Sequence, residues 1–281
     1  MRRPSPARAA RTAIAALGVS LALAGARAAR ADVTLVYDMA IHKPSESTKT
    51  LTWYLTEDKV ALVTTGSKPA RVLYWAKEDK LVLIDEARKQ YIEMAPEDVA
   101  ALSTSMADLS GQMAQVMANL PPDQKAKIAA EMAKRGMAPG TKKTVEIEVL
   151  PMSETKTLHG FECRKNEIVT NGAKSAEVWA VANGPATVTA AEWAPVNSMV
   201  GLLHRVFDAV AGVTKVFDVE MSLPTSLGQG LEGVPVYTKD LEGDAVKGET
   251  TLTSLERGKV DKKAFEIGDG YTKQEMMPAG K

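Results

Sequence analysis

Apolar and polar residues alternate through most of residues 33–94. In the first run, Val33, Leu35 and Tyr37 occupy one phase, and Thr34 lies in the other. Because successive side chains of a β-strand point to opposite faces of a sheet, each such run predicts a half-buried strand. Short charged segments separate the runs, and such segments are typical of hairpins. The sequence therefore predicts an antiparallel sheet in which consecutive strands are neighbours.

A helical segment is predicted to interrupt this sheet over about residues 96–136. It contains no β-branched run and is dominated by Ala, Met, Gln, Lys and Glu, which favour helix. Pro121 and Pro122 break the first helix, and Asp123 starts a second one. The segment is thus predicted to be a helical hairpin inserted in the sheet.

Alternation returns after the hairpin, so the predicted fold class is α+β, mainly β. Asn171 and Gly172 form the dipeptide that most strongly favours a two-residue hairpin turn. A third helix is predicted from Asn197, because apolar residues recur three and four positions apart after it. The predicted strands are 33–41, 51–55, 60–62, 72–75, 81–84, 90–94, 145–149, 158–169, 177–181, 234–238 and 250–255, with Phe265 and Ile267 closing the sheet.

The amino-terminal residues have the pattern of a secretory signal peptide. Arginines precede the apolar run 13–24, and a motif of small residues ends at Ala31. The apolar run is shorter than the roughly 20 residues that a membrane-spanning helix needs. We therefore expect residues 1–31 to be removed. Residues 32–281 would then form a single domain in the periplasm or outside the cell, and not an integral membrane protein.

Removal of the signal peptide would change the charge balance. Residues 1–31 contain six arginines and no acidic residue, whereas the whole chain has 35 basic and 35 acidic residues. The remainder therefore carries a net charge near −6, which argues against binding to nucleic acid. Cys163 is the single cysteine, so the fold has no internal disulfide.

Two segments resemble secreted bacterial proteins of the family called domain of unknown function 4412. They are DEARKQYIEM, at residues 85–94, and TKTLHGFECRKNEIVTNGAKSAEVWA, at residues 155–180. That family has no established activity. The layout is similar, more distantly, to periplasmic lipoprotein carriers and receptors (LolA-like and LolB-like), which implies a curved sheet forming an incomplete barrel around helices and an apolar cavity. The residues that match domain of unknown function 4412 are Tyr91, Gly160, Cys163, Trp179, Pro235 and Phe265, whereas Phe161 stands where that family has tyrosine.

Apolar side chains recur three, four and seven residues apart in the first helix of the hairpin and share one helical face. A carrier would line its cavity with such a face, because methionine adapts to varied apolar ligands. The same spacing also suits ordinary packing on a sheet, and methionine thioethers bind cuprous copper. These alternatives stay open. The candidate cavity residues are Leu102, Met106, Leu109, Met113, Met117 and Leu120.

His159 and Cys163 are the one pair with conceivable chemistry. If both lay in one strand, they would face the same side, where they would share a metal ion or act as a nucleophile pair. Two ligands are too few for a closed zinc site. We therefore expect Cys163 to be a small buried apolar residue and His159 a loop residue. The sequence also has no Gly-rich phosphate loop and no nucleophile elbow, so we expect no catalysis, cofactor or metal.

The leading hypothesis from the sequence is an exported carrier that shields a lipid or a lipidated protein. Burial of apolar surface would drive binding, at about 25 cal/mol per Å², and the helical hairpin would act as a movable lid. The first alternative is a fully packed interaction or scaffold protein of the cell envelope. The second alternative is a copper-handling protein.

Overall fold

The computed structural model describes residues 32–42, 46–66, 69–134, 146–210 and 231–275. Residues Ala31–Lys281 form one compact unit. The predicted signal peptide, residues 1–31, lies outside the described residues, and its removal stays a prediction.

Twelve strands in the described residues form one sheet that is not closed. The strand order is β12-β6-β5-β4-β3-β2-β1-β11-β10-β9-β8-β7. Neighbouring strands are antiparallel, except that β12 runs parallel to β6 at one edge. The predicted class, α+β and mainly β, is confirmed. The strands are β1 (Val33–Ile41), β2 (Ser47–Leu55), β3 (Lys59–Thr64), β4 (Ala70–Trp75), β5 (Lys80–Asp85), β6 (Gln90–Met94), β7 (Ile147–Leu158), β8 (Phe161–Thr170), β9 (Ala173–Val181), β10 (Val234–Glu242), β11 (Ala245–Arg257) and β12 (Thr272–Lys273).

Three helices accompany the sheet in the described part of the chain: α1 (Pro96–Ala118), α2 (Pro122–Lys134) and α3 (Ala190–Val210). The predicted helical hairpin is therefore present as α1 and α2. Helix α1 begins at a proline, whose missing N–H costs nothing in the first turn. The carboxylate of Asp98 accepts a hydrogen bond of 2.9 Å from the backbone N–H of Ala95, which fixes the start of α1.

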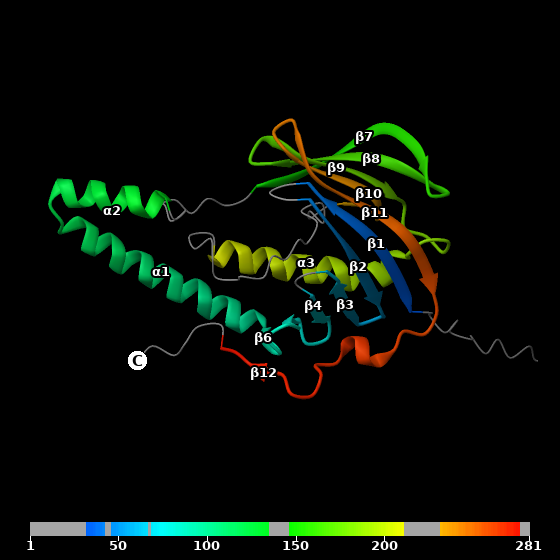
Figure 1. Ribbon diagram of the computed structural model, residues 1–281, viewed down its shortest axis with the longest axis horizontal. Coiled ribbons are helices and arrows are strands. Elements are labelled where there is room, and N and C mark those ends of the chain that lie inside the picture. Colours follow the sequence, from blue (N-terminus) through cyan, green and yellow to red (C-terminus); the bar gives the residue numbers. More distant parts are fainter. Residues whose placement is uncertain (1–31, 43–45, 67–68, 135–145, 211–230, 276–281) are drawn as a thin grey trace, which may run out of the picture. The chain divides into compact units, whose positions relative to one another are not determined.

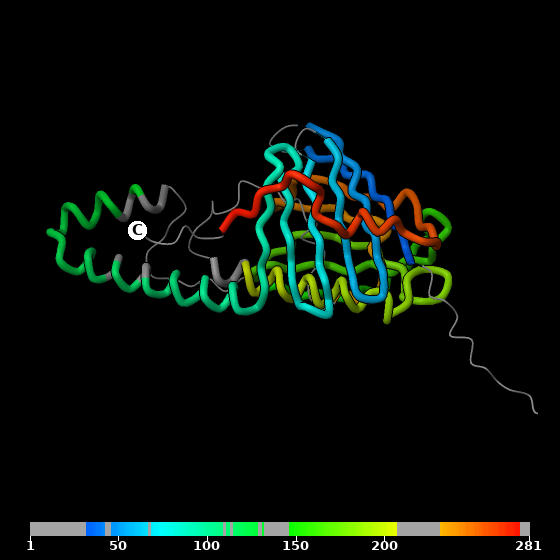
Figure 2. Tube along the Cα trace, turned by 90° about the horizontal axis from the view of Figure 1, so that it is seen from below, coloured from blue at the N-terminus to red at the C-terminus, as the bar shows by residue number. Residues whose placement is uncertain are grey.

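The sheet buries both of its faces around strands β3 to β5. In β5, Leu81 and Leu83 belong to the main core, in which α3 packs. Val82 and Ile84 point to the opposite face, where Val260 of the carboxy-terminal segment, residues 258–275, covers them. Figure 2 shows this segment, in red, running across the blue and cyan strands. Burial on both faces explains why β5 is continuously apolar instead of alternating.

The end of the sheet differs from the sequence prediction. Phe265 belongs to the 3₁₀-helix η1 (Lys262–Phe265), and Ile267 lies outside any strand. Both side chains pack on the second face of the sheet. The prediction of a closing strand at these residues was wrong, because apolar residues two apart also suit a segment that lies across a sheet. The strand in this region is β12, at the edge beside β6.

Helix α3 also starts earlier than predicted, at Ala190 instead of Asn197. Pro195 lies inside the helix, where a proline usually ends or kinks a helix. A capping box overrides that signal. The backbone N–H of Thr189 donates to the Glu192 carboxylate at 2.8 Å, and the N–H of Glu192 donates to the Thr189 hydroxyl at 3.3 Å. The spacing Thr-x-x-Glu is the sequence signature of such a start.

Candidate functional site

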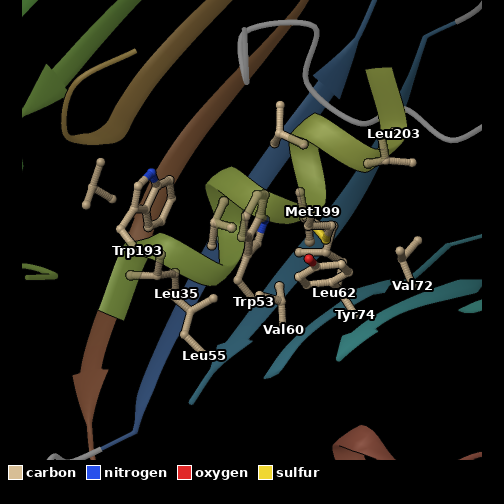
Figure 3. Packing of buried hydrophobic residues seen from close by; sticks show 14 of the residues in the cluster. Leu35, Trp53, Leu55, Val60, Leu62, Val72, Tyr74, Trp193, Met199 and Leu203 are labelled. Carbon is tan, nitrogen blue, oxygen red and sulfur yellow. The ribbon is translucent and has the colours of Figure 1, made fainter. Parts of the chain in front are cut away.

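Helix α3 packs along one face of the sheet, and its apolar side lies in the centre of the main core (Figure 1). The indole rings of Trp193 and Trp53 stack with their centroids 5.8 Å apart. Met199 is fully buried, and Figure 3 shows it beside Leu62 and Tyr74. Protein side chains therefore fill the face of the sheet beneath α3.

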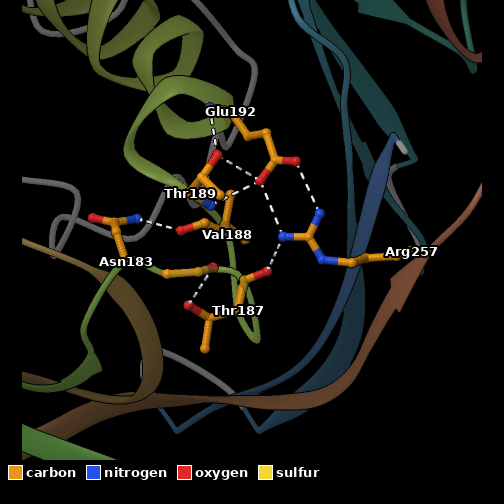
Figure 4. Close-up of polar contacts among 7 residues, drawn as sticks. Asn183, Thr187, Val188, Thr189, Glu192 and Arg257 are labelled. Atoms are coloured by element: carbon orange, nitrogen blue, oxygen red, sulfur yellow. Dashed lines mark hydrogen bonds and ion pairs between the residues drawn. The ribbon is translucent and has the colours of Figure 1, made fainter. Parts of the chain in front are cut away.

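A partly buried ion pair connects the start of α3 to the end of β11 (Figure 4). The two guanidinium nitrogens of Arg257 donate to the two carboxylate oxygens of Glu192 at 2.9 and 3.1 Å. Arg257 also donates to the backbone carbonyl of Thr187 at 2.7 Å. Glu192 is 7% exposed, whereas 30% of the Arg257 side chain is accessible, so water is largely excluded from the carboxylate but not from the guanidinium. The same carboxylate closes the capping box, and it therefore fixes both the helix start and its attachment to the sheet.

The arrangement lowers the pKa of Glu192. Hydrogen bonds from Arg257 are the main cause, and those from Thr189 add to them. Together they outweigh burial and hold the pKa at about 2, below the ordinary value of 4.5. In return, Glu192 raises the pKa of Arg257.

The lowered pKa of Glu192 should make the free energy of unfolding depend on pH in the acid range. Since the pKa of Glu192 is lower in the folded chain, its stabilising effect is complete above about pH 4.5 and is lost as the pH falls towards 2. We expect the free energy of unfolding to fall by on the order of 3 kcal/mol more in the wild type than in Glu192→Gln between these limits. Urea unfolding at a series of pH values measures the difference. Parallel curves for the two proteins would contradict the assignment.

A second polar contact lies further along α3. Arg205 donates to the Asp79 carboxylate at 2.9 Å, and the hydroxyl of Tyr74 donates to the same carboxylate at 2.7 Å. Burial and the neighbouring carboxylate raise the pKa of Tyr74. The Arg205–Asp79 pair is exposed, with 52% and 39% of the two side chains accessible. It is therefore a weaker attachment than the Glu192–Arg257 pair.

The residues of the predicted cavity stripe differ in burial along α1. Leu102 is buried near the start of the helix, where α1 packs against α3. Met106, Met117 and Leu120 are half-buried. The side chains of Leu109 and Met113 lie outside the described residues. Two further apolar residues of the hairpin are exposed, Val116 by 61% and Ile128 by 39%.

Of the four stripe residues whose side chains are described, Leu102 alone lines one of two pockets. Leu102 lines a small pocket of about 170 Å³, beside Glu93, Asp98 and Lys273. Neither Met106 nor Met117 lines this pocket or the larger pocket among strands β1, β2, β10 and β11. The assignment of the stripe as a ligand cavity stays a prediction.

His159 and Cys163 do not lie in one strand, so the condition for a reactive pair is not met, and the expected loop position of His159 is confirmed. His159 and Gly160 form the turn between β7 and β8, with φ angles of 49° and 83°. Asn171 and Gly172 form the predicted turn between β8 and β9 in the same way, with φ of 50° and 78°. Both are two-residue hairpins with positive φ.

Cys163 is fully buried in the main core. Its thiol donates a weak hydrogen bond of 3.5 Å to the carbonyl of Phe161. Burial raises the pKa of the thiol, which disfavours the reactive thiolate. The described residues contain no group of three or more His, Cys, Asp or Glu side chains suited to a metal ion. Within the same residues, no helix is both long and apolar enough to span a membrane.

The fold defines an α+β protein with an open antiparallel sheet and a helix packed along one face. No family model matches the chain, so the resemblance to domain of unknown function 4412 has no support from that comparison. No curated protein matches it in sequence.

Several solved structures have a similar course of the chain. An uncharacterized conserved protein from Thermus thermophilus is 6% identical, with a TM-score of 0.43 over 88% of this chain and 91% of that one. PNGF-II is 12% identical, with a TM-score of 0.41 over 87% of this chain, which spans 31% of the length of PNGF-II. A LolA superfamily protein from Nitrosomonas europaea is 8% identical, with a TM-score of 0.27 over 84% and 90% of the two chains. Likenesses this weak carry no argument about function.

Proposed function

We propose that this protein is a non-catalytic protein of the cell envelope that binds an apolar ligand, such as acyl chains, along helix α1. The exposed apolar surface of the helical hairpin supports this proposal. The apolar stripe of α1 is buried at Leu102 but continues beyond the part that the core covers, and Val116 is 61% exposed near its end. Covering such a surface with an acyl chain would gain about 25 cal/mol per Å².

The envelope location in this proposal comes from the signal-peptide pattern of residues 1–31. The site differs from the cavity expected at first, because α3 fills the face of the sheet beneath it. The ligand would therefore lie on the exposed part of α1. It would not occupy the centre of the incomplete barrel.

A charge placed at Val116, on the same helical face as the stripe, tests the proposal. Val116→Asp should abolish binding of a fluorescent fatty acid, because a carboxylate beside the acyl chain would lose its water. It should leave the urea midpoint almost unchanged, since Val116 is mostly exposed already. Fluorescence titration and urea unfolding measure the two effects.

Gln115→Asp is the matched control. It places the same charge in the same last turn of α1, where either carboxylate meets the same unfavourable end of the helix dipole. Gln115 is exposed and lies on the opposite side of the helix from the stripe, so the probe should still bind. Equal loss of binding in both variants, or a wild type that binds no probe, would exclude α1 as the ligand site.

A packed interaction or scaffold protein is the second candidate. The continuous core between α3 and strands β1 to β4 favours it, because a carrier with a central cavity needs space there. On this alternative the exposed hairpin would contact another protein. The fatty acid would not bind, and Val116→Asp would weaken that protein contact instead.

A further inference from the structure

The two edges of the sheet differ in how much backbone they leave unpaired. One edge is β12, a strand of two residues. The other edge is β7, a strand of twelve residues that, within the described part of the chain, pairs with β8 alone (Figure 1). An edge of this length presents backbone N–H and C=O groups that can pair with another chain. It is separate from α1 and independent of the proposed function.

The turn after β7 determines which of its backbone groups point outward. The two-residue turn between β7 and β8 places Leu158 opposite Phe161, as a hydrogen-bonded pair. Hydrogen-bonded and non-hydrogen-bonded pairs alternate along an antiparallel ladder. Thr155 and Thr157 therefore occupy non-hydrogen-bonded positions opposite β8. Their N–H and C=O groups point to the outer edge of the sheet.

The other half of β7 is less suited to pairing. Pro151 has no N–H to donate, and proline within a sheet is confined to edges and bulges. A bulge lies between Pro151 and Thr155 and divides the strand into two parts. The part of the edge that is open to another strand is therefore the one around Thr155 and Thr157, both of which are exposed.

Glu154 and Lys156 lie on one face of the sheet at this edge. The Lys165 ammonium lies 3.3 Å from the Glu154 carboxylate, and the Lys156 ammonium lies over the Trp179 ring, 5.9 Å from its centroid. Lys165 and Trp179 stand opposite each other on β8 and β9, so the two charged side chains of β7 share their face. The Glu154 side chain is still 56% exposed, so it can accept a further cation.

These charges distinguish the ways in which a second copy can pair with this edge. Three antiparallel registers pair the outward-pointing threonines with one another, with a two-fold axis at Thr155, Lys156 or Thr157. An axis at Lys156 places two lysines opposite each other, and an axis at Thr157 places each lysine opposite Leu158. An axis at Thr155 places Glu154 of each copy opposite Lys156 of the other. Opposite charges facing each other across strands stabilise a sheet, whereas like charges destabilise it.

We propose that the protein forms a symmetric dimer in which the β7 edges of two copies pair antiparallel about Thr155. Charged residues on an edge strand usually prevent pairing. In this register they meet opposite charges, and they disfavour the two neighbouring registers. The same surface serves both copies, as a two-fold axis requires, and the two open sheets become one.

Cysteine substitutions in the full-length mature protein test the register. Thr155→Cys should form a disulfide-linked dimer under a mild oxidant, because opposite residues of a hydrogen-bonded pair have Cα atoms about 5.5 Å apart. Thr157→Cys is the matched control. The two copies of this residue would lie about 14 Å apart, beyond the roughly 7 Å that a disulfide spans. The natural Cys163 is buried and does not compete. Non-reducing electrophoresis measures the linked fraction.

Charge reversal tests the assembly without a cross-link. Sedimentation velocity should show the wild type as a dimer with a dissociation constant at or below about 100 μM. Lys156→Glu should weaken association by about tenfold or more, because like charges then meet twice across the axis. Adding Glu154→Lys to it should restore the dimer. Lys247→Glu changes the net charge equally at an exposed site outside β7 and should leave association unchanged.

Several results would overturn this inference. They are a wild type that is monomeric at about 100 μM, equal cross-linking of the two cysteine variants, and a dimer that Lys156→Glu does not weaken. Failure of the double charge reversal to restore association would equally exclude the register. Sedimentation decides the question if Thr155→Cys does not fold. Binding of a fatty acid on α1 is measured separately, so neither proposal depends on the result of the other.

Discussion

Replacing Arg257 by methionine is expected to lower the free energy of unfolding by about 2–3 kcal/mol. The substitution leaves the buried carboxylate of Glu192 without its bidentate partner and the carbonyl of Thr187 without its donor. The carboxylate is 7% exposed with Arg257 in place, so water can replace only part of the interactions that it loses. Chemical unfolding followed by circular dichroism measures the loss.

Two further variants distinguish this pair from an ordinary surface contact. Arg205→Met removes the exposed pair with Asp79 and should cost less than about 1 kcal/mol. Adding Glu192→Gln to Arg257→Met removes the uncompensated charge and should recover part of the loss. A small effect of Arg257→Met, similar to that of Arg205→Met, would mean that the Glu192 carboxylate is well solvated.

The second large effect is expected at Trp53. Trp53→Ala should cost about 3–5 kcal/mol, because it leaves a void in the centre of the core and removes the stack on Trp193. The indole N–H of Trp53 has no hydrogen-bond partner in the described structure. Trp53→Phe keeps an aromatic ring and removes that unpaired donor, so it should cost less than about 1.5 kcal/mol.

The same urea experiment compares the two Trp53 variants. Equal losses in Trp53→Ala and Trp53→Phe would show that the indole ring makes a specific contact beyond its volume. A loss confined to Trp53→Ala would confirm that α3 and the sheet form one tightly packed core at this point.

The sequence predicted most strands and the helical hairpin, because each depends on local patterns. Alternation in β1 and the turn at Asn171 follow from periods and dipeptides that lie within a few residues. The pairing of β1 with β11 could not be predicted in this way, since Val33 and Arg257 are adjacent in the sheet but far apart along the chain. Such pairings depend on tertiary packing, and the local residue pattern of one strand does not indicate which distant strand pairs with it.

The candidate sites were harder to predict than the fold. The stripe of α1 has the same spacing whether a helix, a ligand or solvent covers it, so Leu102 and Val116 look alike in sequence although one is buried and the other exposed. The larger pocket among strands β1, β2, β10 and β11 could not be predicted, because its lining residues lie far apart along the chain. The Thr189-x-x-Glu192 signature was visible in the sequence and would have given the start of α3.

The position of β1 has a consequence for how the chain reaches its native state during synthesis. Strands β1 to β6 are neighbours in chain order and can pair as soon as Met94 has been made. The other edge of β1 must wait for β11, which begins at Ala245. Contacts of such wide sequence separation slow folding. The sheet of the nascent chain thus remains incomplete until nearly all of the chain has been translated.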